Sequence, residues 1–137
     1  MMMPELCNIK ELKANTDAVW SPNGQKFAVG AASGNVFVGW YNRDVGLWIA
    51  NPLSDKAAHD SPVTNVRFDP ISGKCLVSCS TDGKVVCFSH VCEVDNINDG
   101  PFGGLQKDDK LFQFKCTEWV NTVAFSPSGS EIAFASK

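Results

Sequence analysis

The sequence lacks the features of membrane, secreted and nucleic-acid-binding proteins. No apolar run approaches the roughly 20 residues that a transmembrane helix needs. The first residues, MMMPELCNIKEL, have no basic region followed by an apolar core, and a secretory signal needs both. Basic residues are not in excess, since 12 Lys and Arg stand against 15 Asp and Glu. Phosphate binding requires a basic surface, so we expect neither nucleic acid as the main partner nor membrane insertion.

Metal and nucleotide motifs are also missing. None of the six cysteines forms C-x-x-C, and they have no metal-ligand spacing with the two histidines. Cys75, Cys79 and Cys87 lie in hydrophobic runs, where cysteine behaves as a small apolar residue. Neither G-x-x-x-x-G-K-[ST] nor G-x-G-x-x-G occurs, and FGG at 102–104 is too short to cradle a phosphate. We expect reduced, buried thiols in an intracellular protein with no cofactor; the alternative for the cysteines is a zinc site.

What the sequence does contain is an internal repeat. Three segments align, AVWSPNGQKFAVGAASGNVFVGWY, NVRFDPISGKCLVSCSTDGKVVCFSH and TVAFSPSGSEIAFASK. Each begins with a short strand pattern, passes through a turn with proline and glycine, and enters a second apolar strand. In the first two copies a tight turn, ASGN or STDG, leads to a third strand. The repeats lie roughly 50 residues apart, at or slightly beyond the upper end for propeller blades.

The predicted strands are small or apolar on both faces. Such strands suit four-stranded blades packed face to face. Fourth, outer strands are expected at VGLWIA around Trp48 and at Leu111–Phe114, with a loop over most of the polar segment 92–110. No long stretch has helical periodicity, so the predicted fold class is all-β.

A histidine, a serine and an aspartate raise the question of a catalytic triad. His59 opens the pattern H-x-x-x-V-x-x-V-x-F-x-P, and Ser80 and Asp82 lie in L-x-S-x-S-T-D-G-x-V. These residue types can act together in nucleophilic catalysis. A serine nucleophile, however, needs an exposed, strained turn and an oxyanion hole. Ser80 lies in a predicted strand with no such turn, which favours a structural network over a hydrolase.

These patterns resemble the WD repeat, a family in which a histidine, a serine, an aspartate and a tryptophan hydrogen-bond in series within a blade. The resemblance assigns His59, Ser80 and Asp82 to that network and places Phe88 at the tryptophan position. Phenylalanine has no N–H to donate, so the fourth member is missing. The first repeat has Ser33 at the aspartate position, and the third has no histidine in register. These two repeats are therefore expected to depend on packing and turns.

Longer stretches resemble one family of WD-repeat proteins. SPNGQKFAVGA, CFSHVCEVD and WVNTVAFSPSGSEIAF, in this order, are similar to the propeller subunit of the actin-related protein 2/3 complex, the subunit 1 family. The resemblance runs from about Asp17 to Lys137. It implies that residues 1–137 form a partial WD-repeat β-propeller of about two and a half four-stranded blades, in a ring that is not closed. The expected repeats cover about 14–52, 59–114 and, truncated, 117–137.

The family ring has seven blades. The chain is therefore expected to be a fragment or truncated gene model, or to come from a lineage with a reduced protein. The resemblance implies a non-catalytic scaffold subunit that contributes to actin filament nucleation and branching. The implied partners are actin-related proteins, the other subunits of the complex and actin filaments, in the cytoplasm and cytoskeleton. The alternatives are another WD-repeat adaptor, or a fragment with no independent function.

Exposed aromatic and arginine side chains carry most of the energy of protein interfaces. On this basis the candidate partner contacts are Trp48, Phe102, Trp119, Arg43 and Arg67. For the two tryptophans the alternative is packing between blades, which is favoured in a propeller. For the arginine at position 67, which alternates with two apolar residues, the alternative is simple exposure to solvent.

Overall fold

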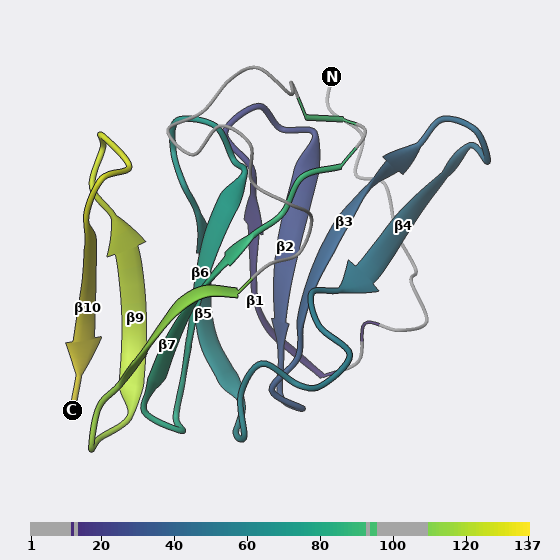
Figure 1. Cartoon of the computed structure of the whole chain (residues 1–137). Helices are drawn as coiled ribbons and strands as arrows, with labels where there is room; N and C mark the ends of the chain where they lie inside the picture. Colours follow the sequence, from purple (N-terminus) through teal and green to yellow (C-terminus); the bar gives the residue numbers. More distant parts are fainter. Residues whose placement is uncertain (1–11, 13, 93, 96–109) are drawn as a thin grey trace, which may run out of the picture.

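The computed structural model describes residues 12, 14–92, 94–95 and 110–137, and all elements in these ranges are β-strands. No helix among the described residues is long and apolar enough to cross a membrane. The strands form three antiparallel sheets that follow one another along the chain (Figure 1). Sheet A contains β1 (Asn15–Trp20), β2 (Lys26–Ala31), β3 (Val36–Asn42) and β4 (Leu47–Pro52). Sheet B contains β5 (Val63–Phe68), β6 (Cys75–Ser80), β7 (Lys84–Ser89) and β8 (Lys110–Lys115). Sheet C has β9 (Val120–Phe125) and β10 (Ile132–Ser136).

This architecture confirms the predicted all-β fold of two four-stranded blades and one half-blade. The inner strands lie side by side, with β1 against β5 and β5 against β9. The sheets diverge from this inner edge, so that β4 and β10 lie on opposite sides of the molecule (Figure 1). The described strands do not close a ring. The outer strands predicted around Trp48 and at Leu111–Phe114 are β4 and β8.

Glycines set the turns between the strands. In the first turn of each repeat, Gly24, Gly73 and Gly129 have φ of 71°, 66° and 72°. In ASGN and STDG, Gly34 and Gly83 have φ of 87° and 82°. These angles lie in the left-handed region, where a side chain at Cβ would strain the backbone. The glycine-containing segments that the sequence predicts as turns are therefore the places where the chain reverses direction.

Two apolar clusters join the sheets. The cluster between sheets A and B contains Ala28, Val36, Val38, Leu53, Val63, Val66, Phe68, Leu76, Val86 and Phe88. The cluster between sheets B and C contains Val77, Cys79, Val85, Val120 and Val123. Successive residues of β6 thus enter different clusters, because side chains alternate along a strand. Both faces of sheet B are covered over β5 to β7, as the apolar pattern of these strands indicates, whereas β8 is mostly exposed.

The cysteines of sheet B are part of this packing. Cys75, Cys79 and Cys87 are buried free thiols. Burial raises the pKa of Cys75 to about 11 and that of Cys87 to about 12. Thiols with such pKa values stay protonated at neutral pH and pack as small apolar groups.

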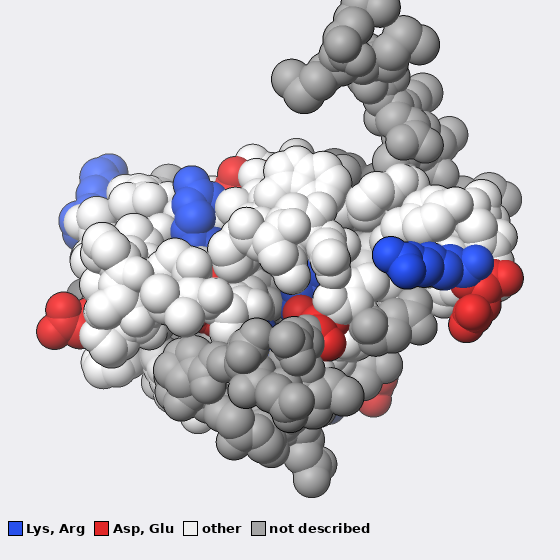
Figure 2. All heavy atoms as spheres, turned by 90° about the horizontal axis from the view of Figure 1, so that it is seen from above, with Lys and Arg blue, Asp and Glu red and all other residues white. Residues whose placement is uncertain are grey.

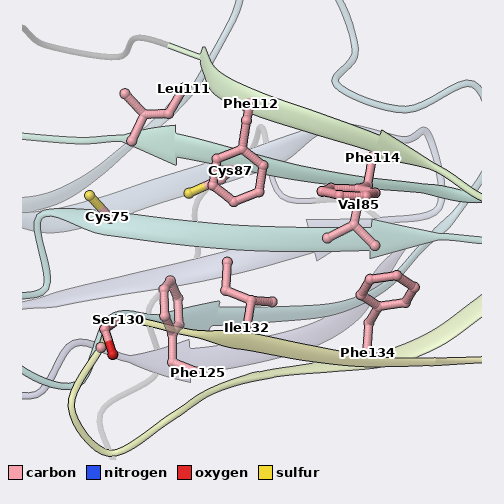
Figure 3. A pocket seen from close by; sticks show the side chains of 11 residues that line it. Cys75, Val85, Cys87, Leu111, Phe112, Phe114, Phe125, Ser130, Ile132 and Phe134 are labelled. Atoms are coloured by element: carbon pink, nitrogen blue, oxygen red, sulfur yellow. The ribbon is translucent and has the colours of Figure 1, made fainter.

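The contact between sheets B and C leaves an apolar groove of about 420 Å³. Phe114 of β8 and Phe134 of β10 face one another across it, with ring centroids 6.2 Å apart (Figure 3). Val85 and Cys87 line the side of sheet B, and Ile132 lines the side of sheet C (Figure 3). The groove lies at the outer part of the contact, where sheet C has two strands against the four of sheet B.

The close approach of turns between neighbouring sheets gives a stability prediction. A Cβ on Gly83 would lie 2.5 Å from the carbonyl oxygen of Cys116, whereas a Cβ on Gly24 would meet no atom within 4 Å. Both glycines have positive φ. Gly24→Ala should therefore lower the unfolding free energy by about 1 kcal/mol through backbone strain alone. Gly83→Ala should lower it by more than about 2 kcal/mol, because the backbone of the segment between β8 and β9, which leads into sheet C, must also move. Urea unfolding of the two variants measures the difference, and equal losses would contradict the close approach.

Candidate functional site

The candidate site is a buried polar cluster around His59, which precedes β5. The His59 side chain lies with Nδ1 3.2 Å from Asp82 Oδ2 and Nε2 2.7 Å from Ser78 Oγ. A carboxylate only accepts hydrogen bonds, so we assign the imidazole proton to Nδ1, and the Ser78 hydroxyl then donates to Nε2. The structure thus brings together the predicted histidine and aspartate, with a serine that the sequence analysis did not select.

The assignment of Ser80 to this network is wrong. The Ser80 hydroxyl donates to the carbonyl of Ser61 over 3.0 Å and accepts from the backbone N–H of Asp82 over 3.1 Å. Ser78 takes its place beside His59. The two serines are two residues apart in β6 and lie on the same face of the strand. The two serines differ in their place along the strand. The imidazole reaches Ser78, whereas Ser80 lies at the end of β6 and stabilises the turn.

The Asp82 carboxylate joins two segments. Besides His59, it accepts hydrogen bonds from the backbone N–H of Asp60 over 2.9 Å and from that of Lys84 over 2.7 Å. The backbone N–H of His59 in turn donates to the carbonyl of Gly34, in the β2–β3 turn of sheet A, over 3.1 Å. The cluster therefore fixes the entry to sheet B against its own β6–β7 turn and against sheet A.

The fourth position of the WD-repeat network is apolar in this chain. Phe88 is 3% exposed and packs in the cluster between sheets A and B. Its ring has no N–H to donate. Phe88 therefore adds to the apolar packing instead of extending the hydrogen-bond series.

The order of contacts Ser78–His59–Asp82 matches that of a catalytic triad, but its burial does not. Ser78 is 0% and His59 1% exposed, so a substrate could reach the serine only if sheets A and B separated. Burial lowers the pKa of His59, against the opposing effect of Asp82. The imidazole is therefore neutral in the folded protein at neutral pH. A buried polar group without a hydrogen-bond partner costs free energy, so these three residues hold one another in a single arrangement. We therefore describe Ser78, His59 and Asp82 as a structural clamp.

A second buried polar cluster surrounds Lys26 of β2. Its Nζ lies 2.9 Å from Asp95 Oδ2, 3.0 Å from the carbonyl oxygen of His90 and 5.5 Å from the centroid of the Phe68 ring. The side chains of Lys26 and Asp95 are both 0% exposed. The alternation of KFAVGA indicates that Lys26 faces sheet B. Nothing in the sequence indicates its partner, which lies 69 residues away.

This cluster also bears on the alternative of a zinc site. His90, Cys92 and Asp95 have possible ligand atoms within 4.8 Å of one another. The Lys26 ammonium lies among them, 2.9 Å from the carboxylate and 3.4 Å from His90 Nδ1. Burial raises the pKa of Cys92 to about 11, so its sulfur is a thiol and not the thiolate that binds zinc. A divalent cation would have to displace the ammonium, and the geometry favours a buried ion pair.

The residues proposed as partner contacts have different surroundings. Trp48 is half-buried and packs on the face of sheet A that points away from sheet B, 5.9 Å from Trp20 and 5.8 Å from Tyr41 between ring centroids. Trp119 is 56% exposed, next to β9. The alternative of packing between described blades does not apply to Trp119, since it is exposed.

The arginines differ as well. Arg43 is exposed in the β3–β4 turn. Arg67 donates to Asp17 Oδ2 over 2.8 Å and thereby links β5 to β1. Its side chain is 39% exposed, so it has an internal role and an accessible edge. Phe102 lies outside the described residues.

The clamp gives a second stability prediction. Asp82→Ala leaves His59 Nδ1 and two backbone N–H groups without their acceptor. It should lower the unfolding free energy by about 1–3 kcal/mol, the cost of buried donors without partners. Asp55→Ala, which removes a carboxylate from an exposed loop, is the control and should change stability by less than about 0.5 kcal/mol. If both variants unfold at the same urea concentration as the parent, the clamp does not contribute to stability.

The lowered pKa of His59 also predicts a dependence of stability on pH. In the unfolded chain the imidazole has its ordinary pKa of 6.5, and in the folded protein the pKa is lower. Above pH 6.5 both states are neutral. Below it the unfolded state binds a proton that the folded state does not, so the unfolding free energy falls by up to about 1.4 kcal/mol per pH unit. Urea unfolding at pH 7.5, 6.5 and 5.5 should show this loss, and His59→Gln should show a smaller slope. An equal slope in the variant would assign the effect to other groups.

Comparison with known proteins agrees with these features. Residues 51–89, which contain the clamp and the first three strands of sheet B, match the family described as WD domain, G-beta repeat. Actin-related protein 2/3 complex subunit 1A of Arabidopsis thaliana is 28% identical over 136 residues, which are 96% of this chain and 35% of that protein. Subunit 1 of Schizosaccharomyces pombe is 28% identical over 90% of this chain and 33% of its own length. Subunit 1A-B of Xenopus laevis is 28% identical over 97% of this chain and 37% of its own length.

A solved structure supports the fold. The β-propeller domain of Cps50 (Swd1) from Myceliophteria thermophila superposes with a TM-score of 0.69 at 16% identity, over 96% of this chain and 35% of that one. The chain thus spans about a third of the length of the curated relatives, 35% for the Arabidopsis protein. The resemblance inferred from the sequence is confirmed: residues 51–89 match the WD repeat, the sheets have the arrangement of part of a β-propeller, and the chain is similar to subunit 1 of the actin-related protein 2/3 complex.

Proposed function

We propose that this chain is a non-catalytic scaffold subunit of an actin-related protein 2/3 complex and contributes to actin filament nucleation and branching. The observation that carries the proposal is the match to subunit 1 proteins from a plant, a yeast and a frog over at least 90% of the chain. The proposed partners are actin-related proteins, the other subunits and actin filaments. The proposed location is the cytoplasm, with the cytoskeleton.

The described surface is consistent with a role in protein contacts. Figure 2 shows the Lys and Arg side chains of one face in separate small groups, with Asp and Glu between or beside them. Such a mixed surface does not favour phosphate-rich partners. Two aromatic side chains are exposed: Phe114 of β8 is 59% exposed, and Trp119, directly before β9, is 56% exposed. Large exposed aromatic groups are typical anchors of protein interfaces.

The non-catalytic role is supported by the burial of the Ser78–His59–Asp82 series. A serine hydrolase requires a nucleophile that a substrate can touch. A fluorophosphonate probe should therefore leave Ser78 unmodified in the folded chain. Labelling of Ser78 under native conditions would favour a hydrolase.

Affinity purification tests the scaffold role. We expect the tagged chain, expressed in cells of its own source, to recover actin-related proteins identified by mass spectrometry. Trp119→Ala should reduce their recovery several-fold if this exposed tryptophan is an anchor, since truncating such anchors commonly costs more than about 2 kcal/mol. Val45→Ala is the matched control, because Val45 is 61% exposed in the β3–β4 turn. Consistent recovery of a different set of partners would instead indicate another WD-repeat adaptor, and recovery of none would leave the chain without a scaffold role of its own.

A further inference from the structure

An amine and a carboxyl group lie in contact in the interior of the protein. The side chains of Lys26 and Asp95 are both 0% exposed, and Nζ of the first lies 2.9 Å from Oδ2 of the second. Lys26 is the first residue of β2 in sheet A, and Asp95 lies in the segment that follows β7 of sheet B. An amine and a carboxyl group are the two reactants of amide formation. Contact between them replaces a bimolecular encounter by a reaction within one molecule.

A second lysine–aspartate pair of the described residues shows how much the surroundings matter. Lys84 Nζ lies 2.7 Å from Asp60 Oδ2, but the aspartate side chain is 79% exposed. Water solvates both charges of such a pair, and an ammonium group has no lone pair with which to attack carbon. Burial takes the charges of the Lys26–Asp95 pair out of water and favours transfer of a proton from Nζ to a nearby acceptor. Loss of hydration is one of the ways in which proteins make lysine a nucleophile.

His90 supplies an acceptor for this proton. Its Nδ1 lies 3.4 Å from Lys26 Nζ. An ammonium group only donates hydrogen bonds, so Nδ1 is the unprotonated nitrogen of the ring. The carbonyl oxygen of His90 also accepts from Nζ, over 3.0 Å, and holds the amine in place while a proton leaves. His90 is 2% exposed, and its ring centroid lies 5.6 Å from that of Trp40, so this base is enclosed with the two reactants.

The two carboxyl oxygens of Asp95 have different surroundings. Oδ2 accepts from the backbone N–H of Cys92 over 2.8 Å. Oδ1 is buried and has no hydrogen-bond partner in the part of the chain that the structure describes. A fixed donor on Oδ2 stabilises the negative charge that this oxygen gains when an amine adds to the carboxyl carbon. No such contact holds Oδ1, which makes it the oxygen that can leave.

We propose that Lys26 and Asp95 form an isopeptide bond through the chemistry of their own site. His90 Nδ1 takes one proton from the Lys26 ammonium, and the neutral Nζ adds to Cγ of Asp95. His90 then returns this proton to Oδ1, and a second proton passes from Nζ to the same oxygen. The bond between Cγ and Oδ1 breaks, and one water molecule leaves.

The products balance the reactants without any further reagent. An ammonium and a carboxylate become a secondary amide and water, and His90 ends in its initial state. The burial of two charges costs free energy that a neutral amide does not incur. The site therefore favours the amide over the separate ions, in contrast to the exposed pair at Lys84 and Asp60.

The bond gives sheet A a covalent link to the segment after β7, between residues 69 positions apart. Such a link restricts the unfolded chain in the way that a disulfide does. Unlike a disulfide, it does not depend on redox conditions. Cys75, Cys79 and Cys87 of sheet B are free thiols, so these cysteines provide no link of this kind.

Mass spectrometry of the full chain tests the proposal. In a preparation whose circular dichroism shows the β-fold, the denatured chain should be lighter than its sequence requires by the mass of one water molecule. A protease digest should contain a branched peptide that joins residues 26 and 95, and none that joins residues 60 and 84. Lys26→Arg is the matched control, because it keeps a cation in the site but replaces the amine by a poor nucleophile. It should have the full mass and no branched peptide.

The role of His90 has a separate measurement, the rate at which water is lost. Samples taken at intervals during cell-free synthesis follow the two masses of the parent chain and of His90→Gln, which keeps a hydrogen-bonding side chain but removes the base. The variant should form the bond about a hundredfold more slowly. An equal rate would remove His90 from the mechanism. The proposal as a whole is overturned if the folded parent chain has its full mass, or if the branched peptide joins other residues.

Discussion

The burial of strands β5 to β7 of sheet B on both faces is the constraint on which the rest of the structure depends. Val77 on one face of β6 and Leu76 on the other lie in different apolar clusters, and each is 0% exposed. Such a sheet is stable only between two others, since apolar surface left in water is costly. Sheets A and C supply this cover, and the inner strands lie side by side because that is where the sheets can approach most closely. The propeller-like arrangement thus follows from strands that have no polar face.

Apolar packing alone does not fix how the sheets sit on one another, and the buried polar groups do so. The His59–Asp82 pair, the bonds from Asp17 and Asn65, and the ion pair of Lys26 with Asp95 each join segments far apart in the sequence. A buried polar group without a partner costs free energy, so each pair allows one relative position of its two segments. The Ser78–His59–Asp82 series, which resembles a catalytic triad, belongs to these groups, and its serine and histidine are enclosed between the sheets.

A scaffold role is consistent with a structure of this kind. Its buried polar groups hold the sheets together, and aromatic side chains such as Trp119 and Phe114 are exposed on the described residues.

The sequence by itself determined the features that depend on near neighbours in the chain. Proline, glycine and the alternation of apolar residues predicted the strands, the turns at Gly34 and Gly83, the sandwiched sheets and the WD-repeat family. They also placed Asp82 beside His59 through the family pattern. Only the tertiary structure decided which of two serines on one face of β6 contacts the imidazole, and it selected Ser78 over Ser80. It likewise paired Lys26 with Asp95 and Arg67 with Asp17, because partners about 50–70 residues apart are brought together by sheet stacking. Local periodicity fixes which face a side chain occupies, but what lies opposite that face is set by the approach of another sheet.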